Sequence, residues 1–182
     1  MRRVITDPVK HFTAPGFQIK HAVDPWEREG AASLRRRVFC REQGLFGEDD
    51  RDAIDETAIP IVALALWGVY ADAVVGTVRI HEEEPGLWWG SRLAVCEAHR
   101  RVGALGSALI RLAVSSAHAR GCTRFLAHVQ SQNVPLFRRL RWKTVEEVEL
   151  HGRLHHRMEA DLADYPPFHQ PETGFLALRA AA

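Results

Sequence analysis

Several features are scarce in this sequence, and each scarcity argues against a class of protein. Three cysteines among 182 residues are odd in number and unevenly spaced, which argues against a disulfide framework and suits a reducing cytoplasm. A formal net charge of +1 gives no electrostatic reason to bind nucleic acid or an anionic membrane. The longest apolar run, residues 59–69, contains Pro60 and Gly68 and is too short to span a bilayer.

The remaining composition is that of an ordinary globular protein. Hydrophobic residues make up 46% and charged residues 26% of a chain long enough to bury a substantial core. The basic N-terminus is not followed by the apolar core of a signal peptide. We see no internal repeat and no domain boundary. We therefore expect one cytoplasmic domain over residues 1–182, with an N-terminal arm over 1–16 and a C-terminal tail over 163–182.

Hydrophobic periodicity predicts the order of the secondary-structure elements. Asp24 and Pro25 suit the cap and first position of a helix. Three consecutive strands linked by hairpins exclude a doubly wound fold and favour an α/β (α+β) sandwich, a mixed sheet with helices on both faces. The expected strands are residues 17–23, 61–70, 74–81, 87–95, 124–130, 146–150 and 154–162, and the expected helices are residues 26–43, 105–119 and 134–140.

The turn between the fourth expected strand and the second expected helix has two interpretations. Gly103, Ala104 and Gly106 let a ligand approach the backbone, and Arg100 and Arg101 add positive charge. The turn lies at a helix N-terminus, where N–H groups lack partners and the dipole favours anions. These features are typical of a pyrophosphate-binding turn. A turn that is glycine-rich only for close packing fits the same residues, because such a turn alone is a weak signal.

An acidic segment follows the first expected helix. Its acidic residues are Glu48, Asp49, Asp50, Asp52, Asp55 and Glu56. The segment is either a solvated loop, the usual fate of a run of charge, or a rim that attracts a cationic amine substrate.

The histidines near the C-terminus do not predict a metal site. His151, His155 and His156 have no cysteine or acidic complement with zinc-ligand spacing. On a strand, His155 and His156 point to opposite faces, so one of the two is a candidate to line a substrate pocket.

Two separated motifs resemble those of the GNAT family of acyl-CoA-dependent N-acyltransferases, and the resemblance covers residues 17–162. Residues 101–106 are similar to the fingerprint Arg/Gln-x-x-Gly-x-Gly/Ala, with Ala104 where the first glycine is usual. Asn133 and the short helix that bears Phe137 are similar to a second fingerprint. The resemblance implies the GNAT fold, a mixed sheet of about seven strands in which the fourth and fifth strands splay apart. It also implies acetyl-CoA as co-substrate.

The resemblance also implies which residues hold coenzyme A. Backbone N–H groups of the turn would bind the pyrophosphate, the fourth strand would bond the pantetheine arm, and an N–H near Val95 would stabilise the oxyanion. Phe137 occupies the position of the usual tyrosine acid and cannot donate a proton, so water or another residue must protonate the thiolate. The expected contacts are Leu93, Ala94, Val95, Arg100, Arg101, Val102, Gly103, Ala104, Leu105, Gly106, Ser107, Asn133, Phe137 and Arg138.

Acyl transfer to an amine also needs a base, because an ammonium with a pKa of about 10 must lose a proton. We expect catalytic roles for Glu42, Glu83 and His128, although His128 also suits a buried core position. The residues expected to contact the acceptor are Asp52, Asp55, Arg79 and Gln130, and the two aspartates are further candidate bases.

A closer resemblance suggests the biological setting. Residues 37–46, 50–55, 76–79 and 88–95 are similar to a small GNAT subgroup associated with nitrilase-containing gene clusters of nitrogen-starved bacteria. The N-terminal half is also similar to acyl-homoserine-lactone synthases.

The expected function is therefore an acetyl-CoA-dependent N-acetyltransferase acting on a small-molecule amine, without a metal. One alternative is a related transfer with a longer acyl chain or an acceptor like S-adenosylmethionine. The other is an acyl-CoA-binding sensor or scaffold with little turnover. Adjacent Trp88 and Trp89 also suggest a homodimer contact, because one ring must face outward.

Overall fold

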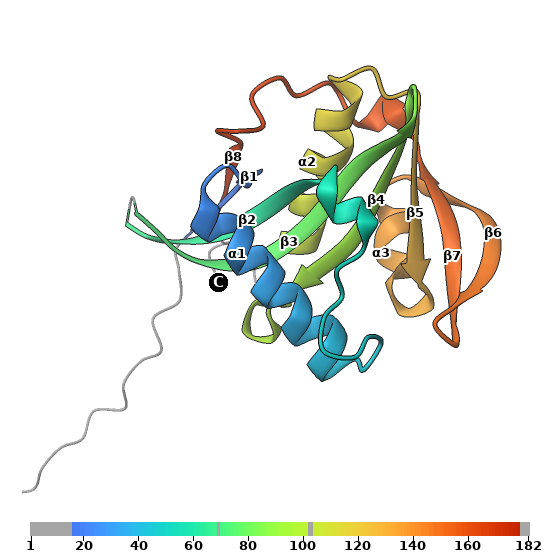
Figure 1. Cartoon of the computed structure of the whole chain (residues 1–182). Coiled ribbons are helices and arrows are strands. Elements are labelled where there is room, and N and C mark those ends of the chain that lie inside the picture. Colours follow the sequence, from blue (N-terminus) through green and yellow to red (C-terminus); the bar gives the residue numbers. More distant parts are fainter. Residues whose placement is uncertain (1–15, 69, 102–103, 179–182) are drawn as a thin grey trace, which may run out of the picture.

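A computed structural model describes residues 16–68, 70–101 and 104–178, and in these ranges eight strands form one mixed sheet (Figure 1). The strand order is β6-β7-β5-β4-β3-β2-β1-β8. Neighbouring strands in the described ranges are antiparallel, except that β4 and β5 are parallel. The strands are β1 (Gly16–His21), β2 (Ile59–Trp67), β3 (Tyr70–Glu84), β4 (Leu87–Val95), β5 (Arg124–Gln130), β6 (Trp142–Leu150), β7 (Arg153–Ala160) and β8 (Phe175–Leu178).

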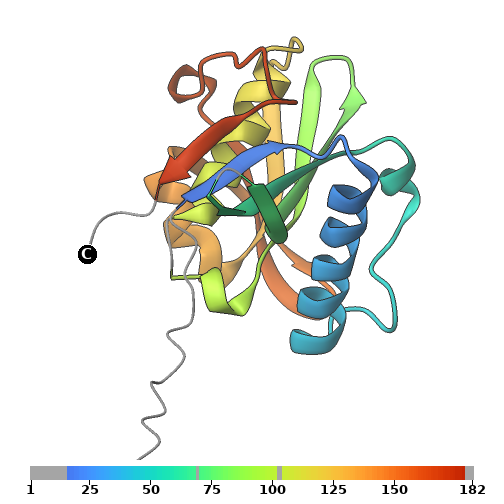
Figure 2. The same cartoon turned by 90° about the vertical axis from the view of Figure 1, so that its left-hand side faces the viewer.

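Helices cover both faces of the sheet, as predicted. α1 (Pro25–Arg35) packs on one face, and α2 (Leu105–His118) and α3 (Val134–Arg139) pack on the other (Figure 2). The expected long first helix is α-helical only to Arg35 and continues as a π-helix, η1 (Arg36–Glu42). Such π-helical turns are often found at functional sites, and η1 leads directly to the cavity described below.

The larger core lies between the sheet and α2. Leu105, Leu109 and Leu112 are almost fully buried there, as their helical spacing predicts. The helix lies so close to the sheet that a Cβ atom added to Gly76 would be 2.9 Å from Leu109. Two smaller groups of buried residues lie on the α1 side. Apolar side chains thus cover the sheet from both faces, and the strand order places β4 and β5 inside the sheet and not at its edges.

Three details of the strands differ from the expectations. The described sheet has eight strands where about seven were expected, because the expected C-terminal tail supplies β8, which pairs with β1. The turn expected at 71–73 is part of β3, since Gly68, with a φ of +62°, already reverses the chain. β6 begins at Trp142 rather than at residue 146. Of the expected arm, residues 1–15 lie outside the described residues.

The segment after η1 is held against the sheet by a cluster of arginines and aspartates. We call Arg35, Arg79, Arg92, Asp50, Asp52 and Asp55 the arginine–aspartate cluster. Asp50, which is 1% exposed, accepts hydrogen bonds from Arg35 (2.7 Å) and Arg92 (2.9 Å). Arg79 donates two bonds of 2.7 Å to Asp52. Since the cluster holds three charges of each sign, these aspartates form neither a solvated acidic loop nor a cation-attracting rim.

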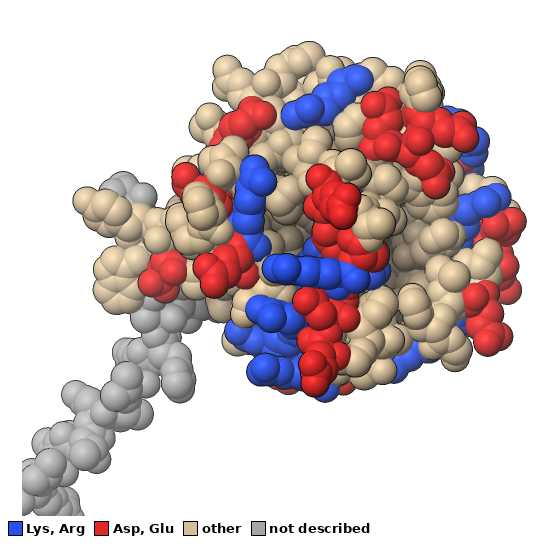
Figure 3. All heavy atoms as spheres, viewed as in Figure 1, with Lys and Arg blue, Asp and Glu red and all other residues tan. Residues whose placement is uncertain are grey.

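The other three acidic residues of the segment are exposed to solvent, as expected for a solvated loop. They are Glu48, Asp49 and Glu56. Figure 3 shows basic and acidic side chains beside one another on the face in view. No described helix is both long enough and apolar enough to cross a membrane.

Replacing Asp50 tests the cluster. Asp50→Asn removes the charge that faces two arginines, and the loss of one partner from a buried pair costs about 3–5 kcal/mol. We expect the free energy of unfolding in urea to fall by about that amount. The matched control is Asp49→Asn, whose carboxylate lies at the surface 3.8 Å from Arg51 and is expected to change stability by less than about 1 kcal/mol. Equal effects of the two variants would contradict the prediction.

The cluster also predicts acid sensitivity. Hydrogen bonds from Arg79 lower the pKa of Asp52. Burial alone would raise the pKa of Asp55, but hydrogen bonds from Arg35 and Arg79 lower it well below its usual range. Both pKa values are lower in the folded than in the unfolded chain, so this stabilisation is present above about pH 4 and is lost as the pH falls through the folded-state values. Urea titrations should show the free energy of unfolding falling between pH 7 and pH 3. In an Asp52→Asn/Asp55→Asn variant, the free energy of unfolding should fall less over the same pH range.

Candidate active site

β4 and β5 separate in the middle of the sheet, as predicted. They pair only where Leu87–Gly90 faces Arg124–Ala127. Beyond that point β4 carries a β-bulge: Thr77 pairs with Ala94 and Arg79 with Ser91, so Arg92 and Leu93 together face one residue of β3. Arg92 has a φ of +57°, which is costly for a residue with a Cβ atom. The bulge turns β4 away from β5 and leaves the edges of both strands open.

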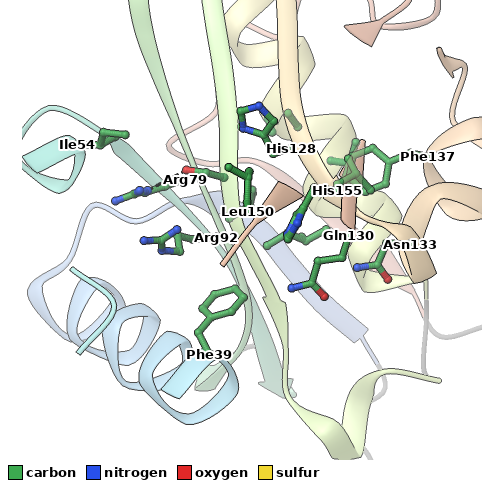
Figure 4. Close-up of a pocket in the computed structure, with 18 of the residues that line it drawn as sticks. Phe39, Ile54, Arg79, Arg92, His128, Gln130, Asn133, Phe137, Leu150 and His155 are labelled. Carbon is green, nitrogen blue, oxygen red and sulfur yellow. Dashed lines mark hydrogen bonds between the residues drawn. The ribbon is translucent and has the colours of Figure 1, made fainter. Parts of the chain in front are cut away.

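A cavity of about 310 Å³ occupies this opening (Figure 4). Its inner part is apolar, with side chains from the two strands, α2, α3 and β6. Its outer part carries polar and aromatic groups from η1 and the segment after it, and from β3, β5 and β7. The inner lining residues used below are Leu93, Val129, Phe137 and Trp142, and the outer ones are Phe39, Gln43, Phe46, His81, His128, Gln130 and His155.

The segment after η1 reaches across the cavity to the β6–β7 hairpin. Gln43 accepts hydrogen bonds from Gln130 (3.0 Å) and, through its carbonyl, from Arg153 (2.8 Å). The rings of Phe46 and His151 meet edge to face at 4.9 Å. Arg92 lies 4.4 Å from the centre of the Phe46 ring. These contacts enclose the outer part of the cavity and restrict its access to water.

The N-terminus of α2 presents backbone donors that have no acceptor within the helix, which suits the pyrophosphate of coenzyme A. The first bond within this helix runs from Ala108 N–H to the Ala104 carbonyl (3.1 Å), so the N–H groups of residues 105–107 lack helical acceptors. Ala104 has a left-handed φ of +49° and sharply turns the chain into the helix. Among the described residues, a Cβ atom added to Gly106 would meet Leu136 alone, at the ordinary contact distance of 3.7 Å. Val102 and Gly103 lie outside the described residues.

The other predicted coenzyme A contacts have varied surroundings. Leu93, Asn133 and Phe137 line the cavity, whereas Ala94 is buried on the α1 side of the sheet. Among the remaining predicted contacts, Leu105 is buried in the core, Ser107 is half-buried, and Arg101 and Arg138 are exposed. Arg100 donates to the Val95 carbonyl (3.0 Å) and pairs with Glu42.

No tyrosine lines the cavity in the described residues. The buried Phe137 ring packs on Trp142 with ring centres 4.9 Å apart. The Tyr165 hydroxyl donates to the Leu140 carbonyl (2.5 Å) and accepts from Trp142 (3.0 Å), so it belongs to the core. Tyr70 is 76% exposed at the β2–β3 hairpin. The site therefore needs another source for the proton of a leaving thiolate.

Of the three predicted catalytic residues, only His128 lines the cavity. Glu42 is engaged by Arg100, and Glu83 accepts a hydrogen bond from the Trp89 indole (2.7 Å). The His128 ring lies against the Trp89 ring at 4.9 Å and its residue is exposed, not buried in the core. Burial of the ring lowers the pKa of His128, and His155 and Arg157 lower it further.

Of the predicted acceptor contacts, Asp52, Arg79 and Gln130 line the cavity and Asp55 does not. Both aspartates are already bound by arginines of the cluster. Sequence reasoning missed Arg35, Asp50 and Arg92, because their pairings span 15 to 42 residues and leave no local pattern. Strand alternation did separate His155 from His156: His155 lines the cavity and His156 does not. In the described part of the chain, no three His, Cys, Asp or Glu side chains form a metal-binding group.

Several solved structures share this fold at low sequence identity. A proposed N-acetyltransferase from Lactobacillus plantarum is 21% identical, with a TM-score of 0.70 over 79% of this chain and 97% of that one. ElaA of Escherichia coli is 22% identical, with a TM-score of 0.65 over 80% and 98%. The CoA-dependent acyl-homoserine lactone synthase BjaI, solved with SAM and isopentyl-CoA, is 19% identical, with a TM-score of 0.60 over 74% and 75%.

No curated protein matches the chain at a significant level. The family assignment comes from the sequence itself: residues 25–141, well over half of the chain, match the acetyltransferase (GNAT) family. The open edges of β4 and β5 and the free donors of α2 agree with that match. This protein therefore belongs to the acetyltransferase (GNAT) family and is an acyltransferase of that family.

Proposed function

We propose that this protein transfers the acetyl group of acetyl-CoA to the amine of a small molecule. The observation that supports this most directly is the cavity between the separated strands β4 and β5, which Ile110, Ala113 and Val114 of α2 help to line. In the proposed complex, the turn 100–107 holds the pyrophosphate with its N–H groups and Arg101. Leu93, Val95, Asn133 and Phe137 contact the pantetheine arm, which directs the thioester into the cavity.

The chemistry requires a neutral amine and a donor for the developing oxyanion. We assign the oxyanion donor to a backbone N–H of β4 between the bulge and Val95, where a fixed N–H dipole in an enclosed site is most effective. The acceptor amine would enter the outer part of the cavity, beside Gln130 and His128. The Phe39 and Phe46 rings on that side favour an amine with an apolar body. The proposed setting, suggested by the subgroup resemblance, is nitrogen metabolism in the bacterial cytoplasm.

Blocking the α2 N-terminus tests coenzyme A binding. Gly106→Trp places an indole at the first turn of the helix, where Leu136 is the one described neighbour within 4 Å of an added Cβ atom. We expect acetyl-CoA affinity, measured by calorimetry, to fall about tenfold or more, which corresponds to about 1.4 kcal/mol. The control is Arg111→Trp, at an exposed position farther along the same helix, which should bind like the wild type. Equal affinity of the Gly106→Trp variant and the wild type would refute this site.

A second candidate function is acyl transfer to an S-adenosylmethionine-like acceptor. The fold shared with BjaI and the apolar inner cavity, which has room for more than an acetyl group, favour it. Acetyl-CoA at 100 times its Kd should stabilise the protein by about 2.7 kcal/mol, and we expect S-adenosylmethionine alone to leave the melting temperature unchanged. Stabilisation by S-adenosylmethionine in the same thermal-shift series would instead support the second candidate.

Turnover separates both candidates from a sensor or scaffold. We expect release of free coenzyme A thiol from acetyl-CoA with at least one amine of a panel containing phenethylamine, cadaverine and glycinamide. Tight acetyl-CoA binding with no turnover of the panel would favour the sensor.

A further inference from the structure

We propose that His155 is the base of this enzyme: it takes the proton of the attacking amine and delivers a proton to the departing sulfur. This assignment rests on the proposed acetyl transfer and names a residue for a step that the resemblance leaves open. It also supplies the proton that Phe137 cannot donate.

The position of His155 places it on the open part of the sheet. It faces Gln130 in the β5–β7 register, beyond the last pair that joins β4 to β5. Its residue is only 6% exposed, and yet it lines the cavity. Figure 4 shows its ring between Leu150 and Gln130. His155 is therefore a buried titratable group at the reaction cavity.

A hydrogen bond determines which nitrogen of His155 is basic. The Nδ1 atom lies 3.0 Å from the Arg153 carbonyl oxygen. A carbonyl can only accept, so Nδ1 carries the hydrogen and, in the neutral ring, Nε2 carries the lone pair. The described residues provide no hydrogen-bond partner for Nε2. The strand itself thus orients His155 as a proton acceptor, in the way that a backbone carbonyl orients many functional histidines.

The carboxylates that could compete for this role are occupied. Asp52 and Asp55 are bound by arginines that lower their pKa values, which makes them weaker bases. Glu42 pairs with Arg100, and Glu83 accepts from Trp89. Of these four carboxylates only Asp52 lines the cavity, and both of its oxygens accept hydrogen bonds from Arg79.

The groups around His155 provide a route by which its proton can be transferred to solvent. His128 of β5 lies on the same face of the sheet as His155, two residues from its partner Gln130, and is exposed to solvent, so it can relay a proton between His155 and water. The other titratable and charged groups on this side of the sheet and around the cavity are Arg153, Arg157 with its partner Glu146, His151, His81, Arg92 and the Arg79–Asp52 pair.

The proton balance of the reaction follows from these two histidines. The acceptor enters as an ammonium ion and loses its first proton through His155 and His128 to solvent. As the C–N bond forms, Nε2 of His155 takes a second proton from the attacking nitrogen. When the C–S bond breaks, that proton moves to the thiolate. The products are the amide, the free thiol and one proton released to solvent, with no oxidant or further reactant needed.

The substitution His155→Asn tests the assignment with little change to the fold. The asparagine amide nitrogen can still donate to the Arg153 carbonyl, but the side chain lacks a basic nitrogen. General acid–base catalysis contributes about 10²–10⁴-fold, so we expect kcat to fall at least about 100-fold while KM for acetyl-CoA changes less than about twofold. The matched control is His156→Asn, the next residue of β7, which does not line the cavity and should keep kcat within about threefold.

The assay uses acetyl-CoA and the amine of the panel that the wild type acetylates fastest. A His155→Asn variant that keeps the wild-type kcat, or loses no more than His156→Asn, overturns the role of His155 and leaves the proposed function intact. A wild type that acetylates no amine overturns the proposed function and this role with it. If His155→Asn does not fold, nitrogen-15 NMR of the wild type decides the matter: a hydrogen on Nδ1 of neutral His155 is expected, and a hydrogen on Nε2 overturns the assignment.

Discussion

The separation of β4 from β5 is the constraint on which the site depends. Two parallel strands in the middle of a sheet would normally pair along their whole length. Here the bulge at Arg92 turns β4 away after four paired residues. The bulge is held in place because Arg92 donates to Asp50 (2.9 Å) and Asp52 (3.1 Å) and lies over the Phe46 ring. A single strained residue, anchored by a buried ion cluster, thus keeps both strand edges and the cavity open.

The arginine–aspartate cluster also determines the electrostatic character of the site. Because its charges balance, the outer cavity carries no strong negative field that would select an acceptor by charge alone. Selection would then rest on the aromatic and aliphatic side chains of η1 and the following segment. The contacts of Gln43 and Phe46 with the β6–β7 hairpin enclose that side, so the segment after η1 is tied across the cavity to the strands on the other side.

A chain with phenylalanine in place of the usual tyrosine still has titratable groups at the cavity. Phe137 packs on Trp142 and contributes shape, not a proton. Histidines from β3, β5 and β7 reach the same space from different strands. A thiol is a stronger acid than an amine, so a departing thiolate needs less assistance, and in the proposed mechanism His155 provides it.

The sequence by itself determined the order of the elements, the helices on both faces, the family motifs and the phenylalanine at position 137. Periodicity and contiguous motifs carry that information, because each depends on neighbours a few residues apart. Only the tertiary structure decided that the acidic segment is neutralised, that residues 175–178 add an eighth strand, and that His155 faces the cavity. These features depend on partners many residues apart in the chain, and such pairings leave no periodic signal.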